Sequence, residues 1–407
     1  MLGPDGAAVR SLALSWSEDA GTTCTVDGHE LAVQRRRARA PDGRAWLVHS
    51  VEAPTPKDVA RVRKASGKTV PLGLALPLQP EDRGVIYAGL PVVETRVPIR
   101  INAQFDPVTS RSGLAPTRWN SAMLPLLADL WVEVVEDLFA ETPVVAWGIV
   151  PLPAGNGDEK GRSPVVGRLE ALLLERARTE LCKRAAIVVD GTRLVLTELA
   201  VEDARLEDVL EPAEVASLAD LTTTLPASAR DPDGHWRLVL DDWRTAGAPL
   251  PPSVTVETAL ALLNRPGRSP KATISLTAVG LDVGLAGKLA ALPCVVTAAG
   301  EHIIPPAAES LQALLVTTSP LAEQLGVGVR LAGEHLDPSD DPQSVLAWLR
   351  HIGAVIDSPG NEEVVRRLAA AGQAGNQLTE ALTDRATSRP ARRRRADGSR
   401  RTIRGGP

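Results

Sequence analysis

Residues 70–139 decide the fold; they read VPLGLALPL at 70–78, GVIYAGLPVV at 84–93, VPIRINAQF at 97–105 and WNSAMLPLLADLWVEVVEDLF at 119–139. The first three runs are apolar, have the length of strands and end near Gly, Pro or Asp, which is typical of strands joined by short turns. Short connections favour antiparallel pairing. The fourth run repeats apolar residues every three or four positions and predicts one amphipathic helix.

The residues before this stretch extend the sheet. Residues 22–26 and 31–34 flank the pair Asp27-Gly28, and two short apolar runs around Asp-Gly are a strong signal for a β-hairpin. Residues 45–51 are another strand candidate. The N-terminal part of the chain is therefore expected to be rich in strands.

The helix at 119–139 is expected to begin at Asn120 or Ser121, because either side chain can cap it. Pro125 would then lie in the first turn, where its missing backbone donor breaks no hydrogen bond of the helix. The apolar residues 144–150 predict a strand that closes this unit. We therefore expect an α+β fold in which an antiparallel sheet packs against helices.

Changes in composition divide the chain into parts. Residues 1–150 are the α+β unit, and the Pro, Gly and charged residues at 151–165 indicate a linker. We expect one α/β unit at residues 166–250 and a second at residues 251–384. Residues 385–407 are rich in Arg and nearly free of apolar residues, so we expect a disordered tail.

The two α/β units are expected to be degenerate copies of each other. Residues 185–210 and 292–315 share one pattern: an apolar run, a glycine (Gly191 or Gly300), a second apolar run, an acidic residue and a Leu-rich segment. The alternative is that strand–turn–strand–helix units simply recur in α/β chains without any duplication.

The charge of the chain is unevenly distributed. The net charge is −5 over 407 residues, yet residues 385–407 hold nine Arg and one Asp, which leaves −13 on residues 1–384. Because binding to a nucleic-acid backbone needs a basic surface, the acidic body argues against this function for the folded part. The tail alone could contact nucleic acid or an acidic protein.

The cysteines and the termini favour a cytoplasmic location. Cys24, Cys182 and Cys294 lie far apart and match neither a disulfide framework nor a metal-ligand spacing. The first residues, MLGPDGAAVR, show no signal peptide, and no apolar run reaches the ~18 residues that a membrane span needs. We expect a soluble protein without a membrane partner.

Motifs of nucleotide-binding enzymes are incomplete in this chain. A phosphate-binding loop ending at Gly287-Lys288 would need Gly at 282 and Ser or Thr at 289, where Asp282 and Leu289 stand. The DxGxG turn of the GHKL ATPases would need Gly in place of Ala286. The six His residues lack the spacing of a zinc site, and no G-x-S-x-G motif is present. We therefore predict no catalytic residue, metal or cofactor for this chain alone.

One ordered set of motifs between residues 72 and 139 resembles a known family. The matching positions are Leu90-Pro91, Pro98, Asn102, Phe105, Ser110-Arg111 and Trp119-Asn120. This order is similar to the region that follows the ATPase module in sacsin-like proteins and, more distantly, to the middle domain of the large heat-shock chaperone ATPases. A weaker likeness extends to about residue 354. The resemblance implies a middle-domain-like α+β fold for the first unit.

The resemblance also implies a role for the Ser-Arg loop. In the chaperone ATPases an Arg of this loop reaches the terminal phosphate of ATP held by a separate N-terminal module, and Arg111, next to Ser110, stands at the matching position. A guanidinium suits this role because its planar fork of donors fits phosphate oxygens. The alternative is a surface arginine that caps the region of the following helix. Phe105 and Trp119 are expected to be core anchors, and Asn102 to shape the end of its strand.

The N-terminal ATP-binding module of that family has no counterpart in these residues. We therefore expect the non-catalytic body of a sacsin-like, chaperone-type ATP-binding protein, whose ATP and Mg²⁺ are bound only by a module in cis or in trans. The later units would bind a protein client or partner.

Two rival hypotheses come from other classes of function. One is an interaction scaffold of a bacterial defence or DNA-processing system, which would contact nucleic acid through residues 385–407. The other is an enzyme with an unfamiliar site. A buried His beside Asp or Glu in an exposed pocket would favour the enzyme.

Overall fold

The computed structural model describes two compact units. The described residues are 15–18, 22–57, 59, 67–81, 83–153, 163–308, 310–317, 319–336 and 342–370. Those up to Glu202 and from Glu211 to Val254 form the first unit, whereas Asp203–Leu210 and those from Thr255 onward form the second. The architecture is α+β, as predicted, with a large and mostly antiparallel sheet packed against helices. The Arg-rich tail lies outside the described residues.

The first unit contains an eight-stranded sheet in the order β1-β3-β4-β5-β8-β6-β7, with β2 paired to β3. The strands are β1 (Ser15–Glu18), β2 (Thr22–Val26), β3 (His29–Arg39), β4 (Ala45–Pro54), β5 (Thr69–Pro77), β6 (Gly84–Tyr87), β7 (Pro91–Thr95) and β8 (Arg100–Ala103). Their pairing is antiparallel except between β6 and β8. The predicted hairpin is confirmed: Asp27 and Gly28 both have positive φ, as a two-residue type I′ turn requires.

Two local predictions were wrong, and a third gave the right element with too wide a range. Residues 84–93 form two short strands, β6 and β7, because a turn at Gly89 with φ of 80° reverses the chain. Within residues 97–105 the strand β8 covers Arg100–Ala103 alone. Residues 144–150 belong mostly to a helix, α2 (Pro143–Ile149), which starts with Pro at its first position.

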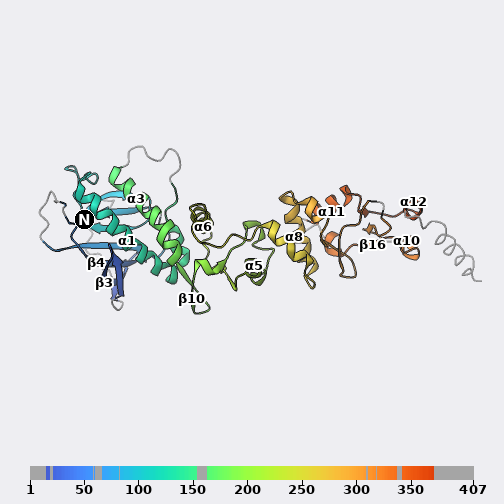
Figure 1. The fold of residues 1–407 in the computed structure, drawn as a ribbon, viewed down its shortest axis with the longest axis horizontal. Helices are drawn as coiled ribbons and strands as arrows, with labels where there is room; N and C mark the ends of the chain where they lie inside the picture. The colour runs from blue at the N-terminus through green and yellow to red at the C-terminus, as the bar shows by residue number, and fades with distance from the viewer. Residues whose placement is uncertain are drawn as a thin grey trace, which may run out of the picture. The chain divides into compact units, whose positions relative to one another are not determined.

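The predicted long helix is confirmed as α1 (Arg118–Glu141). Its N-cap is Thr117, whose hydroxyl accepts a hydrogen bond from the backbone N–H of Asn120 at 3.1 Å, so neither Asn120 nor Ser121 is the cap. Because the helix begins earlier than expected, Pro125 lies inside it. Figure 1 shows α1 and α3 (Pro164–Arg176) lying over the sheet.

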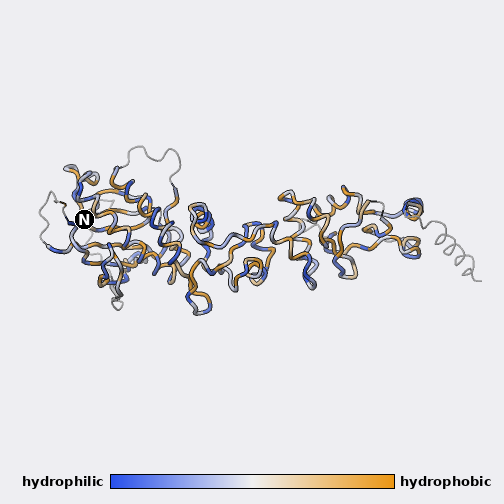
Figure 2. Tube along the Cα trace, viewed as in Figure 1, coloured by the Kyte–Doolittle hydropathy of each residue, from blue (hydrophilic) through white to orange (hydrophobic). Residues whose placement is uncertain are grey.

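One buried core joins α1 to residues well beyond the predicted linker. Trp147 of α2 packs edge-on against Phe139 of α1, with ring centroids 4.7 Å apart, and lies 6.4 Å from the ring of Trp243. Its indole N–H donates to the carbonyl of Ala229 at 2.7 Å. In Figure 2 hydrophobic segments (orange) lie along the strands and helices of this unit. The expected boundaries at residues 150 and 165 therefore fall inside the first unit.

The rest of the first unit is built from short elements. They are η1, a π-helical turn (Ala177–Leu181), α4 (Cys182–Arg184), β9 (Ala186–Val189), β10 (Thr192–Val195), η2 (Leu196–Glu198), β11 (Leu199–Ala200), α5 (Pro212–Leu218), β12 (Thr223–Thr224), η4 (Ala227–Ala229) and α6 (His235–Thr245). Strands β9 and β10 form a hairpin, β11 runs parallel to β12, and Glu202 forms a parallel bridge with Val254.

The second unit is also built from short elements. They are η3 (Ala204–Leu206), α7 (Val256–Ala259), η5 (Leu260–Asn264), α8 (Pro270–Asp282), α9 (Ala286–Leu289), β13 (Val295–Val296), β14 (His302–Ile303), β15 (Leu314–Leu315), α10 (Pro320–Gln324), β16 (Val329–Arg330), η6 (Gly333–Leu336), α11 (Pro342–His351), β17 (Val355–Ile356) and α12 (Asn361–Ala370). Strands β13 and β14 form a hairpin, and β15 lies between the parallel strands β16 and β17.

The two units thus share an order of elements. Each has a hairpin and then a strand whose parallel partner follows a short helix, β12 for β11 and β16 for β15. A second parallel pairing follows a later helix that contains Trp: an isolated bridge from Glu202 to Val254 in the first unit, and β17 with β15 in the second. The two Trp-bearing helices, α6 and α11, are followed by Gly247 and Gly353, both with positive φ. Their common origin remains a prediction.

The three thiols are buried and free. Burial, with a smaller effect of Glu133, raises the pKa of Cys24 to about 11, and burial raises the pKa of Cys294 to about 12. Burial also raises the pKa of Cys182. Among the helices of the described residues, none combines the length and the apolar character needed to cross a bilayer.

Candidate functional site

The candidate site lies on the face of the sheet opposite α1. Leu72 and Ile101 are buried and belong to the core that contains α1. Ser50, Gly73 and Asn102 alternate with such core residues on β4, β5 and β8, and they are half-buried or exposed. Because side chains alternate between the two faces of a strand, these three residues lie on the other face.

These three residues are direct neighbours across the strands. Ser50 pairs with Gly73, and Gly73 pairs with Asn102. A Cβ atom at Gly73 would make only ordinary contacts, the nearest being 3.6 Å from the carbonyl oxygen of Asn102. Backbone packing therefore does not require glycine at position 73. The absence of a side chain there leaves open space above the middle of the row.

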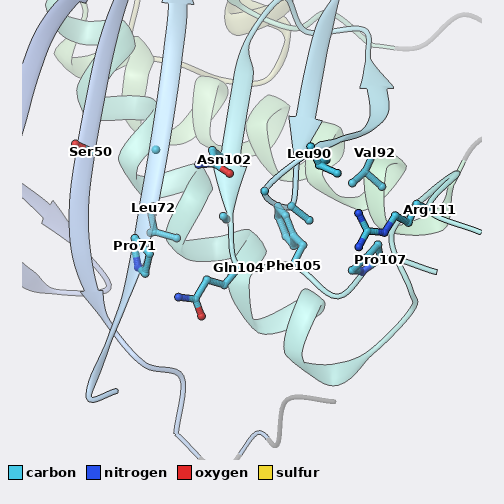
Figure 3. Close-up of a pocket in the computed structure, with 14 residues that line it drawn as sticks. Ser50, Pro71, Leu72, Leu90, Val92, Asn102, Gln104, Phe105, Pro107 and Arg111 are labelled. Carbon is cyan, nitrogen blue, oxygen red and sulfur yellow. The ribbon is translucent and has the colours of Figure 1, made fainter. Parts of the chain in front are cut away.

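A pocket of about 390 Å³ lies over this row. Its other walls come from the turn at residues 88–90 and from Val92, Gln104, Phe105, Pro107 and Arg111. In Figure 3 the side chain of Arg111 reaches from its loop toward Pro107 and Phe105, on the opposite side of the pocket from Asn102. Strands and loops that are distant in sequence therefore converge on one cavity.

The loop that carries Arg111, residues 107–114, is called the arginine loop below. Pro107 and Leu114 form a bridge at its base, and the Val108 N–H donates to the Gly113 carbonyl at 3.0 Å. At the tip the Arg111 N–H donates to the Val108 carbonyl at 2.9 Å, and Arg111 has a φ of 57°. This left-handed conformation is uncommon for a residue other than glycine.

Two buried side chains hold the chain at both ends of this loop. The Oδ1 atom of Asn120 accepts from the Asp106 N–H at 2.8 Å, and its Nδ2 atom donates to the carbonyls of Asp106 and Ala115 at 2.8 and 2.7 Å. The indole N–H of Trp119 donates to the Gln104 carbonyl at 2.6 Å. The Trp-Asn pair that the sequence marks as a motif therefore anchors the loop.

The predicted site residues differ in their placement. Arg111 is exposed and lines the pocket, whereas Ser110 is exposed and bonds to the hydroxyl of Ser112 at 2.7 Å without lining it. Phe105 and Trp119 are each 1% exposed. Asn102 lies inside β8 on the open face, and so it lines the pocket instead of shaping a strand end.

Of the residues that the structure describes, Arg111 is the one charged residue that lines this pocket, and no described carboxylate lines it. Among the described residues no ion pair involves Arg111. Arg100 on the same face differs, because it pairs with Glu81 at 2.7 Å and lies over the ring of Trp46 at 4.8 Å. An anion entering the pocket would meet a guanidinium that no Asp or Glu of the described residues already neutralises.

A second pocket of about 540 Å³ lies in the same unit, lined mostly by apolar residues together with Arg96, Glu170 and His235. The His235 ring bonds to the Val150 carbonyl at 3.2 Å, and Glu170 accepts from the Thr95 hydroxyl and the Arg96 N–H at 3.0 and 2.9 Å. These polar groups are engaged in the fold.

A buried His beside Asp or Glu in an exposed pocket would favour an enzyme, and the described residues show no such combination. The buried His49 lies 3.5 Å from Asp137, but this pair lines neither of the two pockets. The described residues also hold no group of three or more His, Cys, Asp or Glu side chains able to bind a metal.

Comparisons with family models, with curated proteins and with solved structures gave no match to this chain. The chemistry of the site must therefore be argued from its own residues. The guanidinium of Arg111, the side-chain amide of Asn102 and the hydroxyl of Ser50 offer hydrogen-bond donors to an anionic group. Sequence reasoning identified Arg111 but not Ser50, Gly73, Gln104 or the anchoring role of Asn120.

Proposed function

We propose that the chain is the non-catalytic body of a cytoplasmic, sacsin-like, chaperone-type ATP-binding protein. Arg111 contacts a phosphate of ATP that is held by an ATP-binding module in the same polypeptide or in a separate subunit. The later α/β elements bind a protein client or partner. The carrying observation is that Arg111, exposed on an anchored loop, is the single charge, and no carboxylate appears, among the described residues that line the pocket.

The residues present fit one part of an ATP site. Arg111 is suited to a phosphate because its guanidinium can donate two parallel hydrogen bonds to phosphate oxygens. The described residues provide no acidic cluster for Mg²⁺, so the module would bind the metal and make most of the nucleotide contacts. Bound ATP supplies the phosphoryl group, and this chain contributes one positive charge to it.

A calorimetric titration of the isolated chain with ATP tests whether the module, and not this chain, makes most of the contacts to the nucleotide. A hydrogen bond to a charged group contributes roughly 1.5–3 kcal/mol, whereas a millimolar dissociation constant already corresponds to about 4 kcal/mol. We therefore expect binding weaker than millimolar. Micromolar binding by the isolated chain would contradict the proposal.

The role of Arg111 is tested on the protein purified from its native cells with the ATP-binding module that accompanies it. Arg111→Ala should lower ATP turnover by at least about 100-fold, as removal of a donor to the transition state does in other enzymes. The ATP turnover of Arg111→Lys should lie between that of the unchanged protein and that of Arg111→Ala, because a lysine keeps the charge but not the planar fork of donors.

Arg118→Ala is the matched control. Arg118 is exposed at the start of α1 and does not line the pocket, so its loss removes the same charge from a nearby surface. Turnover in this variant should match that of the unchanged protein. The proposal is wrong if no ATP turnover accompanies the purified protein, or if Arg111→Ala turns over ATP as fast as Arg118→Ala.

A further inference from the structure

We infer that Asn120 is a positioning residue for Arg111. Its buried side-chain amide closes the base of the arginine loop and thereby sets where the guanidinium stands in the pocket. The effect of Asn120 on ATP turnover rests on the proposed function, whereas its effect on the loop does not.

The amide of Asn120 is committed to the loop backbone. The residue is 0% exposed, and both N–H groups and the oxygen of its amide bond to main-chain atoms of Asp106 and Ala115 at 2.7–2.8 Å. A primary amide has two donor hydrogens, so no donor remains for any other partner.

The two residues that Asn120 joins stand on either side of the arginine loop. A direct bond from the Ala115 N–H to the Asp106 carbonyl, 2.9 Å long, completes the closure. The side chain of Asn120 therefore holds together the residue before the loop, Asp106, and the residue after it, Ala115. Loss of the amide would leave the Asp106 N–H and the Ala115 carbonyl without these partners.

The helix does not need the side chain of Asn120 for its own start. Thr117 is the N-cap, and its hydroxyl accepts the backbone N–H of Asn120. The amide of Asn120 makes its bonds N-terminal to the helix, at Asp106 and Ala115. Its role is therefore separable from helix capping, and Thr117→Ala supplies a control that weakens the helix start alone.

The tip of the loop depends on this base because it has few contacts of its own. Residues 109–112 are exposed, and Arg111 is held by one backbone hydrogen bond in a left-handed conformation. Exposed segments with few buried contacts open locally at low cost. When the base is released, the tip loses the constraint that keeps Arg111 against the pocket wall.

The first measurement is hydrogen–deuterium exchange of the full chain, followed residue by residue. Asn120→Ala should speed exchange of the Val108, Arg111 and Ala115 amides by about 10-fold or more, with β5 and β8 as protected as before. Thr117→Ala should leave the Val108 and Arg111 amides unchanged. Unchanged loop exchange in Asn120→Ala, or equal acceleration throughout the sheet, would overturn the inference.

The second measurement is ATP turnover of the native assembly in a double-mutant cycle. Asn120→Ala should lower turnover by about 10-fold when Arg111 is present and cause no further loss in an Arg111→Ala background. Equal losses in both backgrounds would show a merely structural role and overturn the inference. If Asn120→Ala does not fold, Asn120→Asp carries the same test, because it keeps the acceptor for the Asp106 N–H and loses the two donors.

The two proposals fail in distinguishable ways. If Arg111→Ala leaves turnover unchanged, the proposed function is wrong, while the exchange measurement still decides whether Asn120 closes the loop. If Arg111→Ala lowers turnover but Asn120→Ala changes neither exchange nor turnover, the proposed function stands and the positioning role is wrong.

Discussion

His335 should make the second unit lose stability in mild acid. This side chain is 1% exposed in η6, and its Nε2 atom accepts the Val296 N–H at 3.0 Å, which joins η6 to β13. Burial lowers the pKa of His335 to about 4, although the neighbouring Glu334 carboxylate acts in the opposite direction. The neutral ring is therefore part of the folded structure.

The size of the effect follows from proton linkage. Below pH 6.5 the unfolded chain binds a proton at His335 that the folded chain rejects until about pH 4. The stabilisation is thus complete above pH 6.5 and is lost as the pH falls toward 4. With 1.36 kcal/mol for each pKa unit, the loss is about 3 kcal/mol in total and about 2 kcal/mol between pH 7 and pH 5.

Two assays measure this loss. NMR titration gives the pKa of His335 directly, and urea unfolding followed by the ¹⁹F signal of 5-fluorotryptophan at Trp348 reports on the second unit, whose only tryptophan it is. His335→Gln can still accept the Val296 N–H but does not titrate, so it should lose about 2 kcal/mol less than the unchanged protein between pH 7 and pH 5. The reasoning would be refuted if His335→Gln and the unchanged protein lost the same free energy of unfolding between pH 7 and pH 5, or if His335 titrated near pH 6.5.

Two further substitutions test the packing of the first unit. In Gly84→Ala the new Cβ would lie 2.0 Å from the carbonyl oxygen of Ile99, so β6 must move away from residues 97–99, and urea unfolding should show a loss of about 3 kcal/mol; stability within 0.5 kcal/mol of the unchanged protein would contradict this. Trp147→Phe leaves the buried Ala229 carbonyl without its indole donor. Among the described residues the buried indole N–H of Trp131 has no hydrogen-bond partner, so thermal unfolding should show Trp147→Phe to be about 2 kcal/mol less stable than Trp131→Phe. Equal stability of the two Phe variants would show that the Trp147 hydrogen bond contributes nothing.

Local patterns predicted α1 and the hairpin well because their signals do not depend on the rest of the chain. The apolar repeat of α1 continues over many turns, and an Asp-Gly pair favours a tight turn wherever it occurs. The run at residues 144–150 was misread because seven apolar residues carry no clear period. There the helix-starting Pro143 and the packing of Trp147 decide the outcome.

The candidate site was predictable only in part. Motif order located Arg111, but Ser50 and Gly73 reach the pocket through the register of β4 and β5, which sequence patterns do not encode residue by residue. The bonds of Asn120 were missed because an Asn near a helix start is usually a cap. In this protein Thr117 takes that role, and the adjacent Trp119-Asn120 pair was the signal that could have pointed to an anchored loop.

The buried cysteines have a practical consequence for labelling. Thiol reagents attack the thiolate, and burial keeps the pKa of Cys24 near 11 and that of Cys294 near 12, with the pKa of Cys182 also raised. At neutral pH these thiols should react slowly. A cysteine introduced at the exposed Ser110 would take up a maleimide dye or a nitroxide far faster, and a single spectroscopic probe could then follow the arginine loop without removal of any native cysteine.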